Sequence, residues 1–514
     1  MEKVYRNITS KDVTNFYKTI KKIQNMGSDN SIPYIISSLL IEMGTTIGDE
    51  KITKDGIDTL LNNLDDLLKD KKYVSGAYYN LANGYFNLFI IKSIKNPNYI
   101  LFNNTELDKV KIYLRKALNS EIKDLSLLTD IFGNLGNCFD YLGRSIDALE
   151  CYDKALNIDP NHGMAVGNKG IALFSYSKLM HNREIMFLIE AYHLLLEGIE
   201  LGVYPEAENT FRIYIDKIKK QIPQKNLEKP LKHSEINIIT ENDFEKFLIE
   251  FCLKHRLYLN LCNFCQRCDL AMGDPIAIKM MIIKTKDNES HPRTDPYLRS
   301  SAYLNQIKQD YITARFLLIT SRYKKLNLTF VDKNVKIIDT LDYSMHNIYI
   351  ELMKTSFTIF YNILDKIAYF INDYVKLNIK PESVNFRRIW YTNYKNKIIN
   401  KKIKNTENLS LNALFDLHRD FESGPYCNLR KTRNALTHRF IHIKVFQGQE
   451  DAENMLENTF FNLTLELAQL VRNAIMYLLH FVYIEEKKKE IKLNKKLPSL
   501  EALELPDELK NPDL

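Results

Sequence analysis

The stretch "IFGNLGNCFDYLGRSIDALECYDKALNIDP", residues 131–160, decides how the first half of this chain folds. Apolar and small residues recur in it at helical spacing in two runs, which a Gly-Arg-Ser turn separates and Pro160 ends. Small residues let two antiparallel helices approach closely, while aromatic rings fill the gaps between neighbouring pairs. The stretch therefore predicts a helical hairpin. The residues that mark its two helices are Phe132, Leu135, Gly136, Phe139, Ala148, Tyr152 and Ala155.

This spacing resembles the 34-residue tetratricopeptide repeat (TPR). Less regular units flank it, and the residues that carry them are Tyr78, Leu81, Ala82, Tyr85, Val110, Leu114, Ala117, Gly170 and Ala191. A single repeat cannot bury its own apolar face, so at least three units are expected, over roughly 71–222. The resemblance implies a surface that holds a protein or peptide ligand and performs no chemistry of its own.

The composition favours a folded, helical protein. The 514 residues are 45% hydrophobic and 26% charged, and Gly (17) and Pro (14) are scarce, which disfavours sandwiches and barrels. The net charge of +7 tolerates an acidic partner such as RNA without requiring one. The first residues lack the apolar core of a signal peptide, and the apolar run "NAIMYLLHFVYI" is shorter than the ~20 residues that span a bilayer. We expect a cytoplasmic protein with free thiols and no membrane contact.

The second half predicts a helical bundle, so that the whole chain is all-α, with a TPR-like region followed by this bundle. "YIELMKTSFTIFYNILDKIAYFINDYV" places a core-facing stripe on one helix, and 327–342 alternates in a way that predicts a small β-hairpin insertion. The stripe consists of Phe357, Phe360, Leu364, Ile367 and Ile371. The predicted divisions are an N-terminal helical segment (1–70), TPR-like repeats (71–222), a connecting region (223–292), the bundle (293–488) and a charged tail (489–514).

The connecting region contains closely spaced cysteines, Cys262, Cys265 and Cys268, with Cys252 or His255 as a further candidate ligand. Zinc or an iron–sulfur cluster needs four ligands. A second Cys-x-x-Cys pair is missing, and these cysteines lie among apolar residues, where free Cys behaves as a small hydrophobe. Core packing is therefore the favoured interpretation, and a metal site is the weaker alternative.

The candidate chemistry lies in "KTRNALTHRFIHIK", residues 431–444. If 427–442 is helical, Leu429, Leu436 and Phe440 face the core. The neighbouring sector carries Arg430, Arg433, Asn434, Thr437 and His438, with Asn434 and His438 at i and i+4. Arg433 borders the apolar stripe, so we expect its guanidinium to be partly desolvated and to act strongly on an anion.

An arginine can neutralise a phosphate in the transition state, and a histidine can relay a proton near neutral pH. That pairing suits cleavage of RNA without a metal, because RNA supplies the 2′-hydroxyl nucleophile. The spacing alone is a weak signal for a catalytic site, because the chain contains a near match in which His480 follows Arg472 and Asn473. We expect that second set to be a solvated helix face.

The Arg-Asn-x-x-x-His motif and the preceding aromatic-rich helix resemble the HEPN superfamily of prokaryotic toxin, CRISPR and abortive-infection systems, and a subgroup of it joins a TPR-like region to a C-terminal HEPN domain. The resemblance implies a metal-independent endoribonuclease without a cofactor, acting on RNA as a homodimer with a composite site. Arg433 would stabilise the phosphate, His438 would act as acid and base, and Asn434 would position them.

Three basic residues flank the motif as weaker RNA-binding candidates: Arg430, Lys431 and Arg439. The subgroup often has an acidic residue just before the histidine, whereas this chain has Thr437. Asp365 and Lys366, on the preceding helix, are weaker acidic and basic candidates. The alternative to a nuclease is a non-catalytic adaptor, in which Arg433 and His438 only cap or pair with neighbouring groups.

Overall fold

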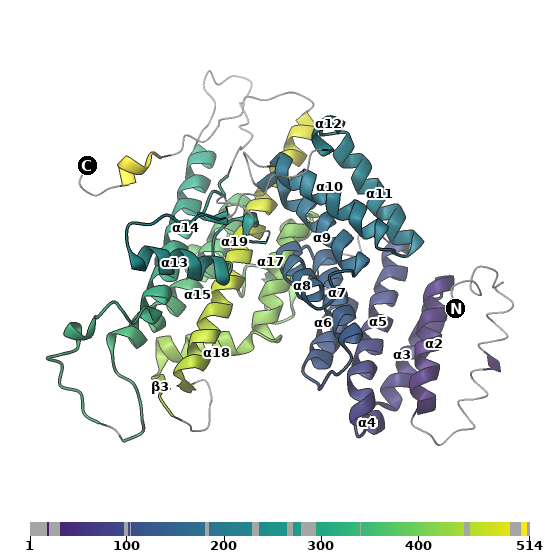
Figure 1. The fold of residues 1–514 in the computed structure, drawn as a ribbon, viewed down its shortest axis with the longest axis horizontal. Helices are drawn as coiled ribbons and strands as arrows, with labels where there is room; N and C mark the ends of the chain where they lie inside the picture. Colours follow the sequence, from purple (N-terminus) through teal and green to yellow (C-terminus); the bar gives the residue numbers. More distant parts are fainter. Residues whose placement is uncertain are drawn as a thin grey trace. The chain divides into compact units, whose positions relative to one another are not determined.

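Two compact units make up the computed structural model, one formed by residues up to 175 and 187–229 and the other by 176–186 and 230 onward. The structure describes residues 18–19, 31–96, 101–102, 104–179, 184–228, 236–264, 271–278, 295–339, 341–446, 453–493 and 505–510. Helices dominate both units (Figure 1). The chain is therefore all-α, as its sequence predicts.

The first unit is a row of helices that pack mainly against their neighbours along the chain (Figure 1). Its helices are α2 (Ser31–Ile47), α3 (Glu50–Asn62), α4 (Leu64–Leu67), α5 (Lys71–Lys95), α6 (Thr105–Leu118), α7 (Leu125–Tyr141), α8 (Ser145–Ile158), α9 (Gly163–Tyr176), α10 (Glu184–Glu200), α11 (Pro205–Lys219) and α12 (Gln224–Leu227). α5 pairs with α6 and α7 with α8, while α6 also packs on α7. This arrangement is that of a stack of helical hairpins.

Glycines set how closely these helices approach. A Cβ at Gly136 of α7 would lie 2.5 Å from the ring of Tyr152 on α8, so the buried tyrosine fills the space that glycine leaves. In the next pair, a Cβ at Gly198 of α10 would lie 2.9 Å from the carbonyl oxygen of Gly163 and 2.9 Å from the backbone nitrogen of Gly167. The predicted close approach at Gly136 is therefore confirmed, and α9 and α10 approach as closely at glycines that the sequence analysis did not single out.

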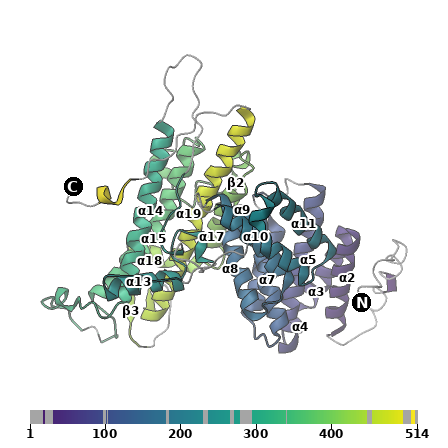
Figure 2. The same ribbon diagram turned by 45° about the horizontal axis from the view of Figure 1, so that its top comes forward.

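The second unit centres on three long helices, α14, α15 and α19, which lie side by side in both views (Figure 2). Its elements are η3 (Ser177–Leu179), α13 (Asp243–Lys254), η5 (Leu261–Asn263), α14 (Asp295–Arg322), η7 (Thr329–Val331), α15 (Ile348–Tyr374), η8 (Pro381–Ser383), β1 (Tyr391–Asn393), β2 (Ile398–Ile399), α16 (Lys401–Lys404), α17 (Leu409–Glu422), α18 (Cys427–His438), β3 (His442–Lys444), β4 (Asn454–Leu456), α19 (Glu457–Leu493) and η9 (Asp507–Lys510).

The core of this bundle is the apolar stripe of α15. Each of its five predicted members is at most 1% exposed, so the stripe is confirmed. Asn347 caps α15 by accepting a hydrogen bond from the amide of Ile350 at 3.1 Å. The Ser356 hydroxyl donates to the Ala314 carbonyl of α14 at 2.7 Å, which fixes the register of the two helices.

The small β elements lie elsewhere than predicted. Residues 329–331 form a 3-10 turn, and no described residue of the predicted hairpin at 327–342 belongs to a strand. The antiparallel pair is instead β1–β2, over 391–399, while β3 and β4 pair in parallel. The alternating run 327–342 lacks a packing surface: its apolar side chains Phe330, Val335 and Ile338 are exposed. Alternation without burial does not stabilise a strand.

The near match on α19 is also corrected. Arg472, Asn473 and His480 are at most 7% exposed, so they do not form the solvated face that we predicted. The Arg472 guanidinium donates to Asn473 Oδ1 at 2.9 Å, and His480 Nδ1 lies 2.7 Å from the hydroxyl of Ser410. These polar side chains are partnered inside the bundle, where they tie α19 to its surroundings.

Helix α19 is also the described helix that is long and apolar enough to cross a membrane, over Glu457–Lys492. Of its apolar window, 83% is buried inside the structure, as in the central helix of a bundle.

Candidate active site

The proposed motif lies on α18, which follows a sharp break after α17. The chain turns at Gly424 and Pro425, and the Tyr426 amide donates to the Asp420 carbonyl at 3.1 Å. α18 then packs against α15 and α17. Leu429, Thr432 and Ala435, spaced three residues apart, are its buried side chains.

Helix α18 ends at His438, earlier than the sequence predicts. Arg439 has extended backbone angles (φ −142°, ψ −164°), and its amide closes the last turn on the Ala435 carbonyl. As a result, the expected core position Phe440 lies outside the helix and is 84% exposed, and Leu436 is only half-buried. The predicted burial of Phe440 is wrong because the chain leaves the helix to form β3.

Arg433 is half-buried. Its guanidinium lies over the ring of Tyr361 on α15, 5.6 Å from the ring centroid, and its Nη1 is 3.4 Å from Asn434 Oδ1. Its Nε is buried without a hydrogen-bond partner among the described residues. A guanidinium that is desolvated and incompletely paired attracts an anion more strongly than a free surface arginine does.

The rest of the motif faces outward. Asn434, Thr437 and His438 are exposed, and the Thr437 hydroxyl donates to the Arg433 carbonyl at 2.9 Å. Thr437 is thus committed to the helix backbone and supplies no acidic group. His438 follows Arg433 by five residues, which places it about 7.5 Å further along the helix axis and about 140° around it.

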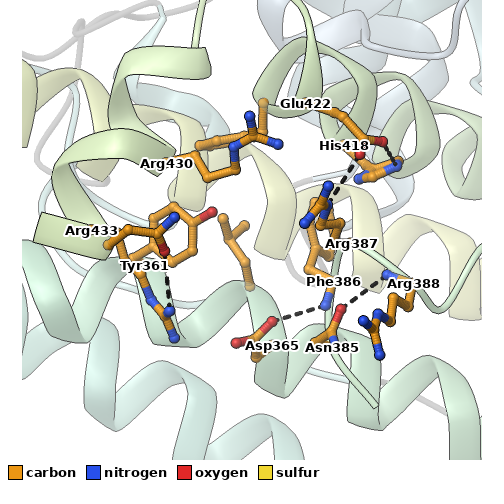
Figure 3. Close-up of a pocket in the computed structure, with 13 residues that line it drawn as sticks. Tyr361, Asp365, Asn385, Phe386, Arg387, Arg388, His418, Glu422, Arg430 and Arg433 are labelled. Carbon is orange, nitrogen blue, oxygen red and sulfur yellow. Dashed lines mark hydrogen bonds and ion pairs between the residues drawn. The ribbon is translucent and has the colours of Figure 1, made fainter. Parts of the chain in front are cut away.

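A cavity of about 390 Å³ opens where α18 meets α15 and α17 (Figure 3). Its walls combine charged and aromatic side chains. The lining residues are Tyr361, Leu364, Asp365, Asn385, Phe386, Arg387, Arg388, His418, Phe421, Glu422, Arg430, Arg433 and Asn434. Among the predicted residues, the cavity brings together Arg430, Arg433, Asn434 and Asp365, and its lining does not include His438, Lys431 or Arg439.

The loop that follows η8 supplies two of the arginines. The Asp365 carboxylate accepts the amide of Phe386 at 2.8 Å, and Asn385 Oδ1 accepts the amide of Arg388 at 3.0 Å. Trp390 is fully buried and its indole donates to the Phe386 carbonyl at 2.6 Å. These bonds hold the backbone of Arg387 and Arg388 against the cavity.

Opposing effects of this environment act on the pKa of the Asp365 carboxyl. Burial raises its pKa, while the amide of Phe386 and the charge of Arg433 act in the opposite direction. Lys366, the other weak candidate on α15, forms an ion pair with Asp310 of α14 instead.

A histidine–glutamate pair on α17 forms the opposite wall. His418 Nε2 lies 3.3 Å from Glu422 Oε2, and burial lowers the pKa of His418 despite that partner. Burial opposes ionisation of Glu422, but bonds from His418, Lys397, Tyr394 and Arg387 outweigh it and hold the Glu422 pKa below its usual range. His418 is therefore neutral and Glu422 ionised near neutral pH.

The remaining predicted basic residues are peripheral. Arg439 makes an exposed ion pair with Glu453, with Nη1 and Oε1 2.6 Å apart, and Lys431 is exposed on α18. Exposed pairs of this kind contribute little to stability.

Sequence reasoning missed most of the cavity residues outside α18, namely Tyr361, Asn385, Phe386, Arg387, Arg388, His418, Phe421 and Glu422. Two signals were available. Arg387 and Arg388 are adjacent in "FRRIW", and His418 and Glu422 are spaced i, i+4 on one helix.

The alternative metal site finds no support among the described residues, where no group of three or more His, Cys, Asp or Glu side chains could hold a metal ion. Cys252 and Cys262 are buried, and burial raises the pKa of Cys252 to about 12, so its thiol is protonated. Thiolates, not thiols, bind metals. Cys265 and Cys268 lie outside the described residues.

Comparison with known proteins identifies two parts of the chain. Residues 293–485 match the family described as LA2681-like HEPN, and residues 129–162 match the tetratricopeptide repeat. No curated protein matches the chain. HEPN domains are often ribonucleases and often dimerise, and tetratricopeptide repeats mediate protein interactions. The first match covers α14–α19 except the end of α19, and so includes the cavity and all of α18.

Proposed function

We propose that the chain is a metal-independent endoribonuclease effector, because residues 293–485 match a HEPN family and residues 129–162 match a tetratricopeptide repeat. The observation that carries the proposal is the state of Arg433: half-buried, beside the exposed Asn434, with a buried Nε that lacks a partner among the described residues. A structural arginine at this depth would be paired. An arginine that binds a substrate phosphate needs a guanidinium N–H that no other group of the protein occupies.

The reaction that this chemistry serves is transfer of the phosphate to the ribose 2′-hydroxyl. The 2′-oxygen attacks the phosphorus and loses its proton to a base, while the P–O5′ bond breaks and the leaving 5′-oxygen gains a proton. His438 relays these protons, and Arg433 neutralises the charge that grows on the phosphate oxygens. Asn434 orients either group. The products are a 2′,3′-cyclic phosphate and a 5′-hydroxyl.

A second copy of the chain would complete the site. One Arg433 and one exposed His438 supply few groups for this reaction, so we infer that a homodimer brings two sets together. Exposed apolar side chains on the segments beside β3 support such an interface: Tyr343, Phe440, Val445 and Phe446. The rings of Tyr343 and Phe446 are 5.8 Å apart, and the Val445 amide donates to the Tyr343 carbonyl. Exposed apolar side chains that gather in one place mark interaction surfaces.

The biological setting follows from the two domains. The TPR-like region would sense or hold a protein or peptide partner, and the HEPN domain would cut cytoplasmic RNA in anti-phage or abortive-infection defence. The TPR-like region would then detect the trigger, and the HEPN domain would respond by cleaving RNA.

Incubating the purified protein with total RNA and with tRNA tests the activity. The wild type should cleave in the presence of EDTA, and His438→Ala and Arg433→Ala should each lose most of the activity, roughly 10²-fold or more. Arg299→Gln, an exposed arginine outside the cavity, serves as the matched control and should cleave like the wild type. Equal cleavage by the wild type and both motif variants would point to a contaminating nuclease and reject the proposal.

A non-catalytic adaptor is the second candidate. The observation that favours it is that His438 does not line the cavity that holds Arg433 and Asn434. An adaptor would co-purify with a partner through its repeats and would leave RNA intact under every trigger. RNA cleavage that depends on His438 would eliminate it.

A further inference from the structure

The cavity beside α18 has more positive charge than the proposed cleavage chemistry uses. Four arginines line it, Arg387, Arg388, Arg430 and Arg433, against the two carboxylates Asp365 and Glu422. Only Arg433 has a role in the proposed reaction. The other three come from a different helix turn and from the loop after η8, so the folded chain assembles them from separate segments.

Most of this charge is left unpaired. Arg387 Nε lies 3.1 Å from Glu422, whose other oxygen is 2.7 Å from Lys397. That carboxylate is therefore already occupied. Among the residues that the structure describes, Arg388, Arg430 and Arg433 have no carboxylate oxygen within 4.0 Å. Three guanidinium groups without an ion-pair partner, against the single free carboxyl of Asp365, give the cavity an excess of positive charge that favours an anion.

The walls strengthen the effect of this charge. Leu364, Phe386 and Phe421 contribute apolar surface, and Phe386 and Phe421 are at most 5% exposed. Low-polarity walls reduce the screening of nearby charges, so the field of the arginines is stronger here than on an open surface. Guanidinium groups bind phosphate oxygens in a bidentate manner, which makes phosphate the anion that this arrangement suits best.

The backbone that carries Arg387 and Arg388 is held independently of any ligand. The Asp365 carboxylate fixes the loop through the Phe386 amide, and Arg388 is fixed in turn through Asn385 (Figure 3). Asp365 and Asn385 are thus positioning residues. Because the loop backbone is already ordered, binding would not have to overcome the entropy of ordering it.

We propose that this cavity is a phosphate subsite for single-stranded RNA. It takes the stretch of backbone phosphates that neighbours the bond cut at Arg433 and His438, and Arg388 and Arg430 contribute positive charge to it from opposite sides of the cavity (Figure 3). The size agrees, since a cavity of about 390 Å³ lies in the range that holds a small ligand such as one nucleotide. The identity of the ligand as RNA rests on the proposed function, whereas the phosphate chemistry would equally suit a free mononucleotide.

Fluorescence anisotropy with a short, labelled, fully 2′-O-methylated oligonucleotide tests binding without cleavage, because this probe lacks the 2′-hydroxyl. The full-length wild type, Arg388→Gln, Arg430→Gln and the double variant are titrated at several salt concentrations. Loss of one phosphate contact should reduce the slope of log K against log salt by about 0.7. The double variant should lose roughly tenfold or more in affinity, and Arg430→Lys should restore part of the salt slope, because lysine keeps the charge.

Two controls separate this proposal from misfolding. Arg299→Gln should bind like the wild type, and equal melting temperatures would show that each variant is folded. Binding that depends on Arg388 and Arg430 in a wild type that cuts no RNA would reject the nuclease and keep the subsite.

The results that overturn the subsite are equally specific. An unchanged salt slope and affinity in the folded double variant would reject it. Adenosine monophosphate serves as the competing probe. If its binding depended on Arg388 and Arg430 while oligonucleotide binding did not, the cavity would belong to a free nucleotide and the assignment to an RNA strand would be wrong.

Discussion

Replacing Arg433 with methionine should lower activity without lowering stability. Methionine keeps the length and apolar stem of the side chain but removes the guanidinium. The folded state then loses the interaction with the Tyr361 ring, at 5.6 Å, which contributes about 0.5–1 kcal/mol. It also loses a buried Nε without a partner among the described residues, and leaving such a donor unpaired costs about 1–3 kcal/mol.

The balance predicts that Arg433→Met is as stable as the wild type or more stable by up to about 2.5 kcal/mol. For a domain of this size, each kcal/mol moves the melting temperature by roughly 2–4 °C. Cleavage should fall about 10²–10³-fold, the usual effect of removing one donor that stabilises a transition state. Such opposite responses are typical of a residue that is kept for function at the expense of stability.

Urea or thermal unfolding of the full-length protein and RNA cleavage at matched concentrations measure the two effects. Arg299→Met is the control, because Arg299 is an exposed arginine in an ion pair with Asp373 and should change neither quantity appreciably. A loss of more than about 1 kcal/mol in Arg433→Met would show that Arg433 supports the fold, and cleavage within tenfold of the wild type would refute its catalytic role.

Three further predictions concern the fold and the cavity walls. Gly198→Ala should destabilise the first unit by about 1–3 kcal/mol in urea unfolding, because the added Cβ would lie 2.9 Å from backbone atoms of α9. A variant as stable as the wild type would contradict the close contact of α9 and α10. Because burial lowers the pKa of His418 in the folded state, the unfolded chain binds more protons below pH ~6.5, and the free energy of unfolding should fall as the pH drops through that value. His418→Gln should make this pH dependence less steep, and an equally steep dependence in both proteins would argue against a buried neutral His418. Cys252 should be inert to thiol reagents until the protein unfolds, because burial raises its pKa to about 12, and Cys252→Ser should therefore leave the number of fast-reacting native thiols unchanged.

Local patterns predicted much of the fold because burial repeats at regular spacing. Gly136 and Tyr152 identified a helical hairpin, because a small residue opposite an aromatic ring at that spacing is typical of two closely packed helices. The stripe of α15 was equally clear. Phe440 was mispredicted because helical periodicity does not reveal where a helix ends: the backbone leaves α18 at Arg439 to pair β3 with β4, which lies beyond it in the sequence.

The candidate site was predictable only in part. The sequence indicated Arg433, Asn434 and His438 because they stand within six residues of one helix, but it did not show that only Arg433 and Asn434 line the cavity; their catalytic roles are predictions. The adjacent arginines of "FRRIW" indicate a basic segment, but not that Arg387 and Arg388 line the cavity, because a loop that the Asp365–Phe386 hydrogen bond holds in place brings them there. The predicted exposure of Arg472 was also wrong. Exposure depends on which face of α19 the neighbouring elements cover, and the local sequence does not show which face that is.

The most direct test of the central claim is analysis of the cleavage product on a defined single-stranded RNA in EDTA, beside the same RNA with one 2′-deoxyribose at the cleaved position. We expect a 2′,3′-cyclic phosphate and a 5′-hydroxyl, no cleavage at the deoxy position, and no product with His438→Ala. Cleavage at the deoxy position, or a 5′-phosphate end, would contradict it, since both require a nucleophile other than the ribose 2′-hydroxyl.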